Sequence, residues 1–265
     1  MDKYPQALLL DLDDTIINYG GGAEGSWREV CVLAAREVAT LDAMTLFTEI
    51  DRVRTWYWSD AERHREGRAD LRAASARIAQ QALLEWGYDR PELARRIAER
   101  YRDLREAAVD IFPGAVDALE RLRAHGVRLG LLTNGTGPDQ RRKIDRFDLA
   151  RHFDCIQIEG EFGCGKPDPR VYVAALAALG TRPEASWMVG DNLEWDVAAP
   201  QRVGLSGIWL DGARTGLPAG ATVQPQRIIH SLSELRTGRR RRARCERRAG
   251  GGRDAARWCA ARRRR

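Results

Sequence analysis

Short apolar segments alternate with amphipathic ones from Asp110 onward, and this alternation limits the fold more than any other feature of the chain. The apolar segments predict strands at residues 127–132, 155–158, 186–189 and 207–210. The amphipathic segments predict a helix after Pro113 and further helices at residues 140–147, 170–179 and 194–199. Because strands and helices in alternation form a parallel sheet with helices on both faces, the sequence predicts an α/β fold.

A shorter apolar run at residues 7–10 ends directly in Asp11, Asp13 and Asp14. Because so few apolar residues cannot form a domain alone, we expect this run to be the first strand of the same sheet. The chain has 265 residues, of which 43% are hydrophobic, and this is enough for one sizeable core with an insertion.

The segment between the first strand and Asp110 has helical periodicity, which predicts an all-helical insert in the sheet. The predicted helices begin at a capping box of Ser26 and Glu29, carry apolar residues from Met44 to Tyr57, run from Leu71 to a stop at Gly87, and open at Pro91. We therefore expect a core of residues 1–17 and 109–236, a helical segment of residues 18–108, and a C-terminal segment of residues 237–265.

The net charge of +6 and the pI near 9.3 suggest nucleic acid as a partner, but this charge is concentrated at one end. The segment from Arg239 to Arg265 holds 13 arginines against Glu246 and Asp254, which leaves 31 basic and 36 acidic residues before it. The segment has almost no large apolar residues, so we expect a disordered tail that binds nucleic acid only nonspecifically. The charge of the tail says nothing about the chemistry of the acidic body.

Neither a membrane segment nor a disulfide framework is expected. The chain has no run of about 18 apolar residues, and Asp11 interrupts the N-terminal apolar run that a signal peptide would continue, so a cytoplasmic protein is predicted. The five cysteines are odd in number and scattered without CxxC spacing, which favours free thiols over a zinc site.

Polar side chains follow the predicted strands at the points where the strands end. They are Asp11 and Asp13 after the first strand, Thr133 and Asn134 after residues 127–132, Lys166 after residues 155–158, and Asp191, Asn192 and Asp196 after residues 186–189. Ligands bind open parallel sheets at the carboxyl ends of the strands. We therefore expect carboxylates, a hydroxyl and one lysine to meet at one edge of the sheet.

The segments DLDDT, LLTNG, GKPDP and VGDNLEWD occur in this order and resemble the four motifs of the haloacid dehalogenase superfamily. Each motif alone is weak, but together they extend from Asp11 to Asp196. With the helical insert between the first and second motifs, the chain resembles members with a C1-type helical cap, which include phosphatases of small molecules. The resemblance implies a Rossmann-like core with an inserted helical cap, and it does not cover the tail.

The resemblance also implies roles for the strand-end residues. Asp11 is the nucleophile that takes up the phosphoryl group, and Asp13 protonates the leaving oxygen and later activates water. The side chains of Asp11 and Asp191 and the backbone carbonyl of Asp13 hold Mg²⁺. Phosphoryl oxygens are bound by Thr133, the amide of Asn134 and Lys166. From its position at the start of a predicted helix, Asp196 is expected to steady Lys166 or metal-bound water, with Asn192 as a second supporting residue. The alternative for Asp196 is an acid that only favours the helix dipole.

Electrostatics explains why these groups are needed together. Two unit charges about 4 Å apart repel by about 4 kcal/mol at an effective dielectric constant of 20. A phosphate dianion beside Asp11 and Asp191 therefore requires cations, and Lys166 with Mg²⁺ would supply three positive charges against four negative ones. A small phosphorylated substrate and Mg²⁺ are the expected ligands.

Substrate selection is expected to fall to the cap, where WYWSDAERHREGRADLR concentrates aromatic and basic residues. The candidates for contact with an anionic or hydroxylated leaving group are Trp56, Arg63, His64 and Arg68. A solvated helix face with tryptophans in the core is the alternative interpretation of this segment.

Three other functions compete with phosphomonoester hydrolysis. A phosphosugar mutase would use the same groups, and a haloacid dehalogenase is less similar because dehalogenases lack the second Asp, here Asp13. The third is a noncatalytic protein that binds nucleic acid through the arginine tail. The sequence leaves open the identity of the substrate and the choice between monomer and homodimer.

Overall fold

Six parallel strands form the central sheet in the computed structural model, which describes residues 4–236. In spatial order the strands are β5 (Cys155–Ile158), β4 (Arg128–Thr133), β1 (Ala7–Leu10), β6 (Ser186–Gly190), β7 (Ser206–Leu210) and β8 (Arg227–Ile229). The predicted α/β class is confirmed, and the run at residues 7–10 is a central strand. The predicted disordered tail lies outside the described residues.

Helices cover both faces of the sheet because successive side chains of a strand point to opposite faces. In β1, Leu8 and Leu10 join a core cluster that contains Leu119 of α6, whereas Leu9 joins a second cluster with Tyr172 of α9. The helices of the sheet region are α6 (Ala115–Ala124), α7 (Gly137–Arg146), α8 (Glu159–Phe162), α9 (Pro169–Ala178) and α10 (Ala199–Arg202). Shorter helical turns are η1 (Ala150–His152), η2 (Pro183–Ala185), the π-helical η3 (Leu193–Ala198) and η4 (Leu232–Glu234).

The insert forms a bundle of helices with its own hydrophobic core. Its helices are α1 (Ala23–Glu37), α2 (Ala43–Ser59), α3 (Ala61–Ala69), α4 (Leu71–Glu85) and α5 (Pro91–Ala107). The buried residues of the bundle make one cluster that is separate from the two clusters of the sheet, and Trp27 stacks on Tyr101 in it at 3.7 Å between ring centroids. We call α1 to α5 the helical bundle.

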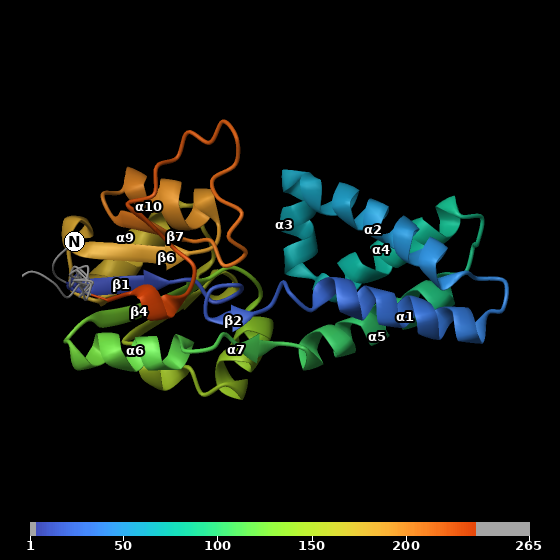
Figure 1. Ribbon diagram of the computed structural model, residues 1–265, viewed down its shortest axis with the longest axis horizontal. Helices are drawn as coiled ribbons and strands as arrows, with labels where there is room; N and C mark the ends of the chain where they lie inside the picture. Colours follow the sequence, from blue (N-terminus) through green and yellow to red (C-terminus); the bar gives the residue numbers. More distant parts are fainter. Residues whose placement is uncertain (1–3, 237–265) are drawn as a thin grey trace, which may run out of the picture.

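The chain enters and leaves the helical bundle through a small antiparallel ribbon. Its two strands are β2 (Ile17–Asn18) and β3 (Asp110–Ile111). The bundle lies beyond the carboxyl end of β1, toward which the arrow of that strand points in Figure 1. The bundle is therefore placed over the edge of the sheet at which the polar strand-end residues lie.

Two details of the bundle differ from the prediction. Helix α1 begins at Ala23, so Ser26 lies inside the helix and donates a hydrogen bond to the carbonyl of Gly22 at 2.8 Å instead of capping it. Helix α3 was not predicted because its sequence AERHREGRA has almost no apolar residue from which to derive a period. It forms because Asp60 caps it, accepting from the amide of Arg63 at 2.9 Å.

A further difference lies after β6. The predicted helix at residues 194–199 is a π-helical turn that passes into the short α10. Asn192 caps this turn, since its side-chain oxygen accepts hydrogen bonds from the amides of Glu194 and Trp195 at 3.0 Å each. Wide turns of this kind are frequent at functional sites.

The remaining predictions concern cysteines and membranes. Among the described residues, Cys31, Cys155 and Cys164 are free thiols, as predicted. No helix between residues 4 and 236 is both long and apolar enough to cross a bilayer.

Candidate active site

A buried lysine between two carboxylates forms the centre of the site. The ammonium group of Lys166 donates to Asp11 Oδ1 and to Asp196 Oδ1, each at 2.7 Å. All three residues are at least 94% buried, with Asp11 6% exposed, Lys166 4% and Asp196 1%. Charged groups buried this deeply are stable only when opposite charges and hydrogen bonds offset the loss of their hydration.

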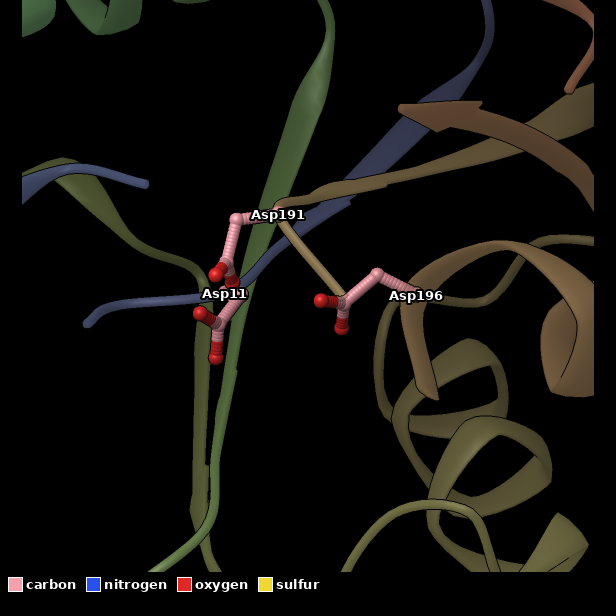
Figure 2. A group of neighbouring side chains, drawn as sticks. All are labelled: Asp11, Asp191 and Asp196. Carbon is pink, nitrogen blue, oxygen red and sulfur yellow. The ribbon is translucent and has the colours of Figure 1, made fainter. Parts of the chain in front are cut away.

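A third carboxylate lies beside this group. Asp191 follows β6 directly, and one oxygen each of Asp11, Asp191 and Asp196 lie within 4.8 Å of one another. Figure 2 shows the carboxylates of Asp11 and Asp191 close together, with Asp196 reaching toward them from the neighbouring turn. Asp196 thus adds a carboxylate to the two that the charge argument from the sequence counted.

The crowding of these acids changes their protonation. Burial raises the pKa of Asp11 well above its usual value; Lys166 opposes this shift, and repulsion by Asp196 and Asp191 adds to it. The Asp191 side chain is open to the cavity, but the protein around it reduces its hydration and raises its pKa to about 7, helped by repulsion from Asp196 and Asp14. Asp11 is therefore ionised at neutral pH only with the help of nearby cations.

The carboxylates fit a divalent cation. The side chain of Asp191 accepts no hydrogen bond from any other described side chain, whereas both oxygens of Asp196 are engaged, one by Lys166 and one by the amide of Asn192 at 3.0 Å. The second oxygen of Asp11 accepts only a long hydrogen bond from the hydroxyl of Thr15, at 3.4 Å. Asp191 and this oxygen of Asp11 are thus the groups best able to hold an ion, and carboxylate oxygens are the ligands that Mg²⁺ prefers.

Asn134 positions Lys166 by a reciprocal pair of hydrogen bonds. Its side-chain amide donates to the carbonyl of Lys166 at 2.7 Å, and its side-chain oxygen accepts from the amide of Lys166 at 2.8 Å. The sequence argument assigned only the backbone amide of Asn134 to the substrate. The side chain has this additional task of joining the loops that follow β4 and β5.

Asp13 is held by two residues that the sequence argument missed. Lys143 of α7 donates to both oxygens of Asp13 at 2.8 Å, and Gln140 donates to one of them at 3.1 Å. Gln140 also donates to the hydroxyl of Thr133, so Asp13 and Thr133 are linked through one amide. The spacing of Gln140 and Lys143 by three residues places them on one helix face, which is the signal that could have identified them.

The site opens into a cavity of about 650 Å³ between the sheet and the helical bundle. The strand-end residues Asp11, Asp13, Thr133, Asn134, Lys166, Asp191, Asn192 and Asp196 all line it. Of the four predicted specificity residues, His64 and Arg68 line the cavity. Trp56 and Arg63 do not, because Arg63 turns back to donate to the carbonyl of Trp56 at 2.8 Å and stacks on its ring.

Comparison with known proteins identifies the family. Residues 5–204 match the haloacid dehalogenase-like hydrolases. The chain belongs to this family. It is therefore an enzyme of the hydrolase class, and the predicted resemblance of this haloacid dehalogenase-like hydrolase to phosphatase-like members is confirmed.

The relatives of this haloacid dehalogenase-like hydrolase include phosphatases. The chain is 34% identical over 258 residues to a phosphoserine phosphatase of Thermus thermophilus, covering 86% of this chain and 96% of the relative. It is 29% identical over 203 residues to a glyceraldehyde 3-phosphate phosphatase of Methanopyrus kandleri, covering 76% and 81%.

A solved structure agrees with the fold. The hydrolase YfnB of Bacillus subtilis, determined with bound magnesium, superposes with a TM-score of 0.66 at 21% identity, covering 88% of this chain and 97% of that one. At this identity the likeness shows the shared fold, including the helical insert.

Proposed function

We propose that this enzyme is a Mg²⁺-dependent phosphomonoester hydrolase that acts on a small phosphorylated metabolite through an aspartyl phosphate on Asp11. The observation that carries the proposal is the position of Lys166, buried between Asp11 and Asp196. Beside them lies the carboxylate of Asp191, which accepts no hydrogen bond from another side chain of residues 4–236. Such a site attracts a cation and then a phosphate dianion. The phosphatases among the relatives support the same reaction class.

In the first step, a carboxylate oxygen of Asp11 attacks phosphorus and the bond from phosphorus to the leaving oxygen breaks. Asp13 gives its proton to that oxygen, so that a neutral alcohol departs. Lys166 fixes the orientation of Asp11 and offsets the charge of the phosphoryl group. Bound Mg²⁺ held by Asp11, Asp191 and the Asp13 carbonyl would neutralise the remaining charge.

In the second step, Asp13 takes a proton from water, which attacks the phosphorus of the aspartyl phosphate. The bond from phosphorus to the Asp11 oxygen breaks, and phosphate leaves with the free carboxylate restored. Thr133 and the amide of Asn134 stabilise the phosphoryl oxygens in both steps, because neither changes its protonation when charge develops. Asp196 acts through Lys166, and Asn192 acts by capping the turn that carries Asp196.

Residues 18–108, which contain the helical bundle, act in this proposal as a cap. The cap closes over a core of residues 1–17 and 109–236. Its residues complete the wall of the cavity above Asp11. A cap that excludes bulk water strengthens the electrostatic contacts inside the site.

Two rival reactions use the same groups. A phosphosugar mutase would pass the phosphoryl group to a sugar hydroxyl, so it would convert a sugar phosphate without releasing phosphate. A haloacid dehalogenase needs no acid for a halide, and the two residues dedicated to holding Asp13 favour hydrolysis of a phosphate ester over dehalogenation.

A panel of phosphorylated metabolites tests the proposal, assayed for phosphate release with Mg²⁺ and with a chelator. We expect turnover with Mg²⁺, a loss of at least a hundredfold with the chelator that is restored by added Mg²⁺, and no turnover by Asp11→Asn. Turnover that is independent of the metal, or an Asp11→Asn enzyme as active as the parent, would overturn the mechanism.

A further inference from the structure

Trp209 contacts one of the two carboxylate residues that are best able to hold a metal ion. It belongs to β7, where it pairs in register with Gly190 at the end of β6. Its indole Nε1–H donates to the backbone carbonyl of Asp191, the next residue along the chain from Gly190, at 2.7 Å. This hydrogen bond joins the carboxyl ends of two neighbouring strands at the edge of the active site.

The carboxylate of Asp191 is less constrained than its neighbours. Lys166 holds one oxygen of Asp11 and one oxygen of Asp196. The amide of Asn192 holds the other oxygen of Asp196. The only hydrogen bond that acts on the Asp191 carboxylate within residues 4–236 comes from its own backbone. The position of this carboxylate is therefore set by the position of its main chain.

The space around Asp191 leaves room for its side chain to move. A second cavity of about 730 Å³ is lined by residues at the carboxyl ends of β7 and β8, among them Trp209. Asp191 lines this second cavity as well as the first one. Because Asp191 borders open space in both cavities, the hydrogen bond from Trp209 to its main chain is an important restraint.

Trp209 is itself firmly held. Strand β7 is paired with β6 on one side and with β8 on the other, so Trp209 lies between Gly190 and Ile228. The residue is 6% exposed, and a buried indole N–H needs an acceptor inside the protein. The distance of 2.7 Å is at the short end of the usual range for N–H···O hydrogen bonds. A rigid strand thus carries the donor that restrains Asp191.

Such a restraint matters more for a small cation than for a large one. Mg²⁺ demands nearly ideal octahedral geometry, with oxygens at about 2.0–2.1 Å, whereas Ca²⁺ accepts flexible arrangements at about 2.3–2.6 Å. Partners that orient a metal ligand typically change metal affinity by about 10- to 100-fold. Loosening of Asp191 is therefore expected to weaken Mg²⁺ binding more than Ca²⁺ binding.

We propose that Trp209 is a positioning residue of the metal site, which holds the backbone carbonyl of Asp191 and so makes the site selective for Mg²⁺ over the larger Ca²⁺. The proposal rests on the proposed function, which requires a metal ion at Asp191. Trp209 acts through Asp191 and has no contact with the ion or with the substrate.

Calorimetric titration of Mg²⁺ and of Ca²⁺ into the parent and into Trp209→Phe tests this role. Phenylalanine keeps a buried aromatic ring in β7 and removes the N–H. The Kd for Mg²⁺ should rise about tenfold, and the Kd for Ca²⁺ should rise about threefold at most. In assays of phosphate release, a correspondingly higher Mg²⁺ concentration should restore the rate of Trp209→Phe, with KM for the substrate unchanged.

Trp187→Phe is the matched control, since Trp187 lies on β6, is 8% exposed and lines neither cavity. It removes the same atoms from the interior and should leave both Kd values unchanged. A parent-like Mg²⁺ affinity of Trp209→Phe, an equal loss of affinity for both ions, or the same loss in Trp187→Phe would overturn the role of Trp209.

Failure of the proposed function gives a different result. A parent that binds Mg²⁺ in the calorimeter but releases no phosphate from any phosphorylated metabolite would refute the phosphatase function and leave the role of Trp209 standing. A parent that binds no Mg²⁺ at all would overturn the metal site and the role of Trp209 together.

Discussion

At the scale of single residues, the site depends on charges that hold one another in place. Asp11 and Asp196 together raise the pKa of Lys166 above its usual value, although burial acts in the opposite direction. The lysine therefore stays charged throughout the physiological pH range. Its charge is shared by two carboxylates, which leaves the third, Asp191, for a metal ion.

Lys143 gives a prediction at this scale. It holds both oxygens of Asp13, so its replacement by methionine should leave the proton donor misplaced. Because a poor leaving group needs the proton most, Lys143→Met should lower kcat for an alkyl phosphate by about 10². The loss for p-nitrophenyl phosphate, whose leaving group is stable as an anion, should be several-fold smaller.

The comparison of the two substrates separates positioning from general damage. Lys143→Arg should recover part of the alkyl phosphate activity, and Arg141→Met, on the same helix and paired with Glu161 at the surface, should change neither rate. Equal losses on both substrates with Lys143→Met would show that Lys143 merely supports the fold.

The residues of the four motifs could be placed from the sequence because each follows an apolar strand of a parallel sheet. Their mutual contacts could not. The sequence predicts Asp196 as one possible support of Lys166, but it does not show that Asp11 shares the same ammonium group, since the hydrogen bonds join loops 30 and 155 residues apart along the chain. Arg63 and Arg68 have the same residue type on one helix, and only the structure shows which of them reaches the cavity.

At the scale of elements, the junction between β6 and the π-helical turn is tightly packed. A Cβ atom at Gly190 would lie 2.2 Å from Asp196 Oδ2, closer than any real contact. Gly190→Ala should therefore push Asp196 away from Lys166 and lower kcat/KM at least tenfold. Gly212→Ala, where a Cβ atom would meet nothing within 4 Å, is the matched control and should retain activity.

This prediction is checked by steady-state kinetics together with thermal melting of both variants. Full activity of Gly190→Ala would mean that the position of Asp196 does not matter for turnover.

Elements with a clear apolar period were predictable, and those formed by polar sequence were not. Strands β4 to β7 and helices α2, α4 and α5 match the apolar segments. Helix α3 was not predicted because it has no apolar stripe. Capping by Asp60 and packing against α2 and α4 stabilise it instead. Strand β8, with only three residues, is too short to show alternation.

At the scale of the whole molecule, the cavity between sheet and bundle contains all the groups that the proposed reaction requires. The groups that carry out the proposed chemistry all lie between Asp11 and Asp196. Deletion of residues 239–265 should therefore leave kcat/KM, measured by phosphate release, unchanged within about twofold. The same deletion should abolish any binding to nucleic acid in a filter-binding assay. Loss of turnover on deletion would favour a functional role for the tail.

The central claim, a covalent phosphoryl group on Asp11, is tested most directly by trapping it. Asp13→Asn cannot activate water, and p-nitrophenyl phosphate needs little help from an acid to leave. Mixed with this substrate and Mg²⁺ and quenched in acid within one turnover, Asp13→Asn should yield a peptide containing Asp11 that is heavier by one phosphoryl group. Release of p-nitrophenol with no added mass on that peptide, or with the mass on another residue, would contradict the account.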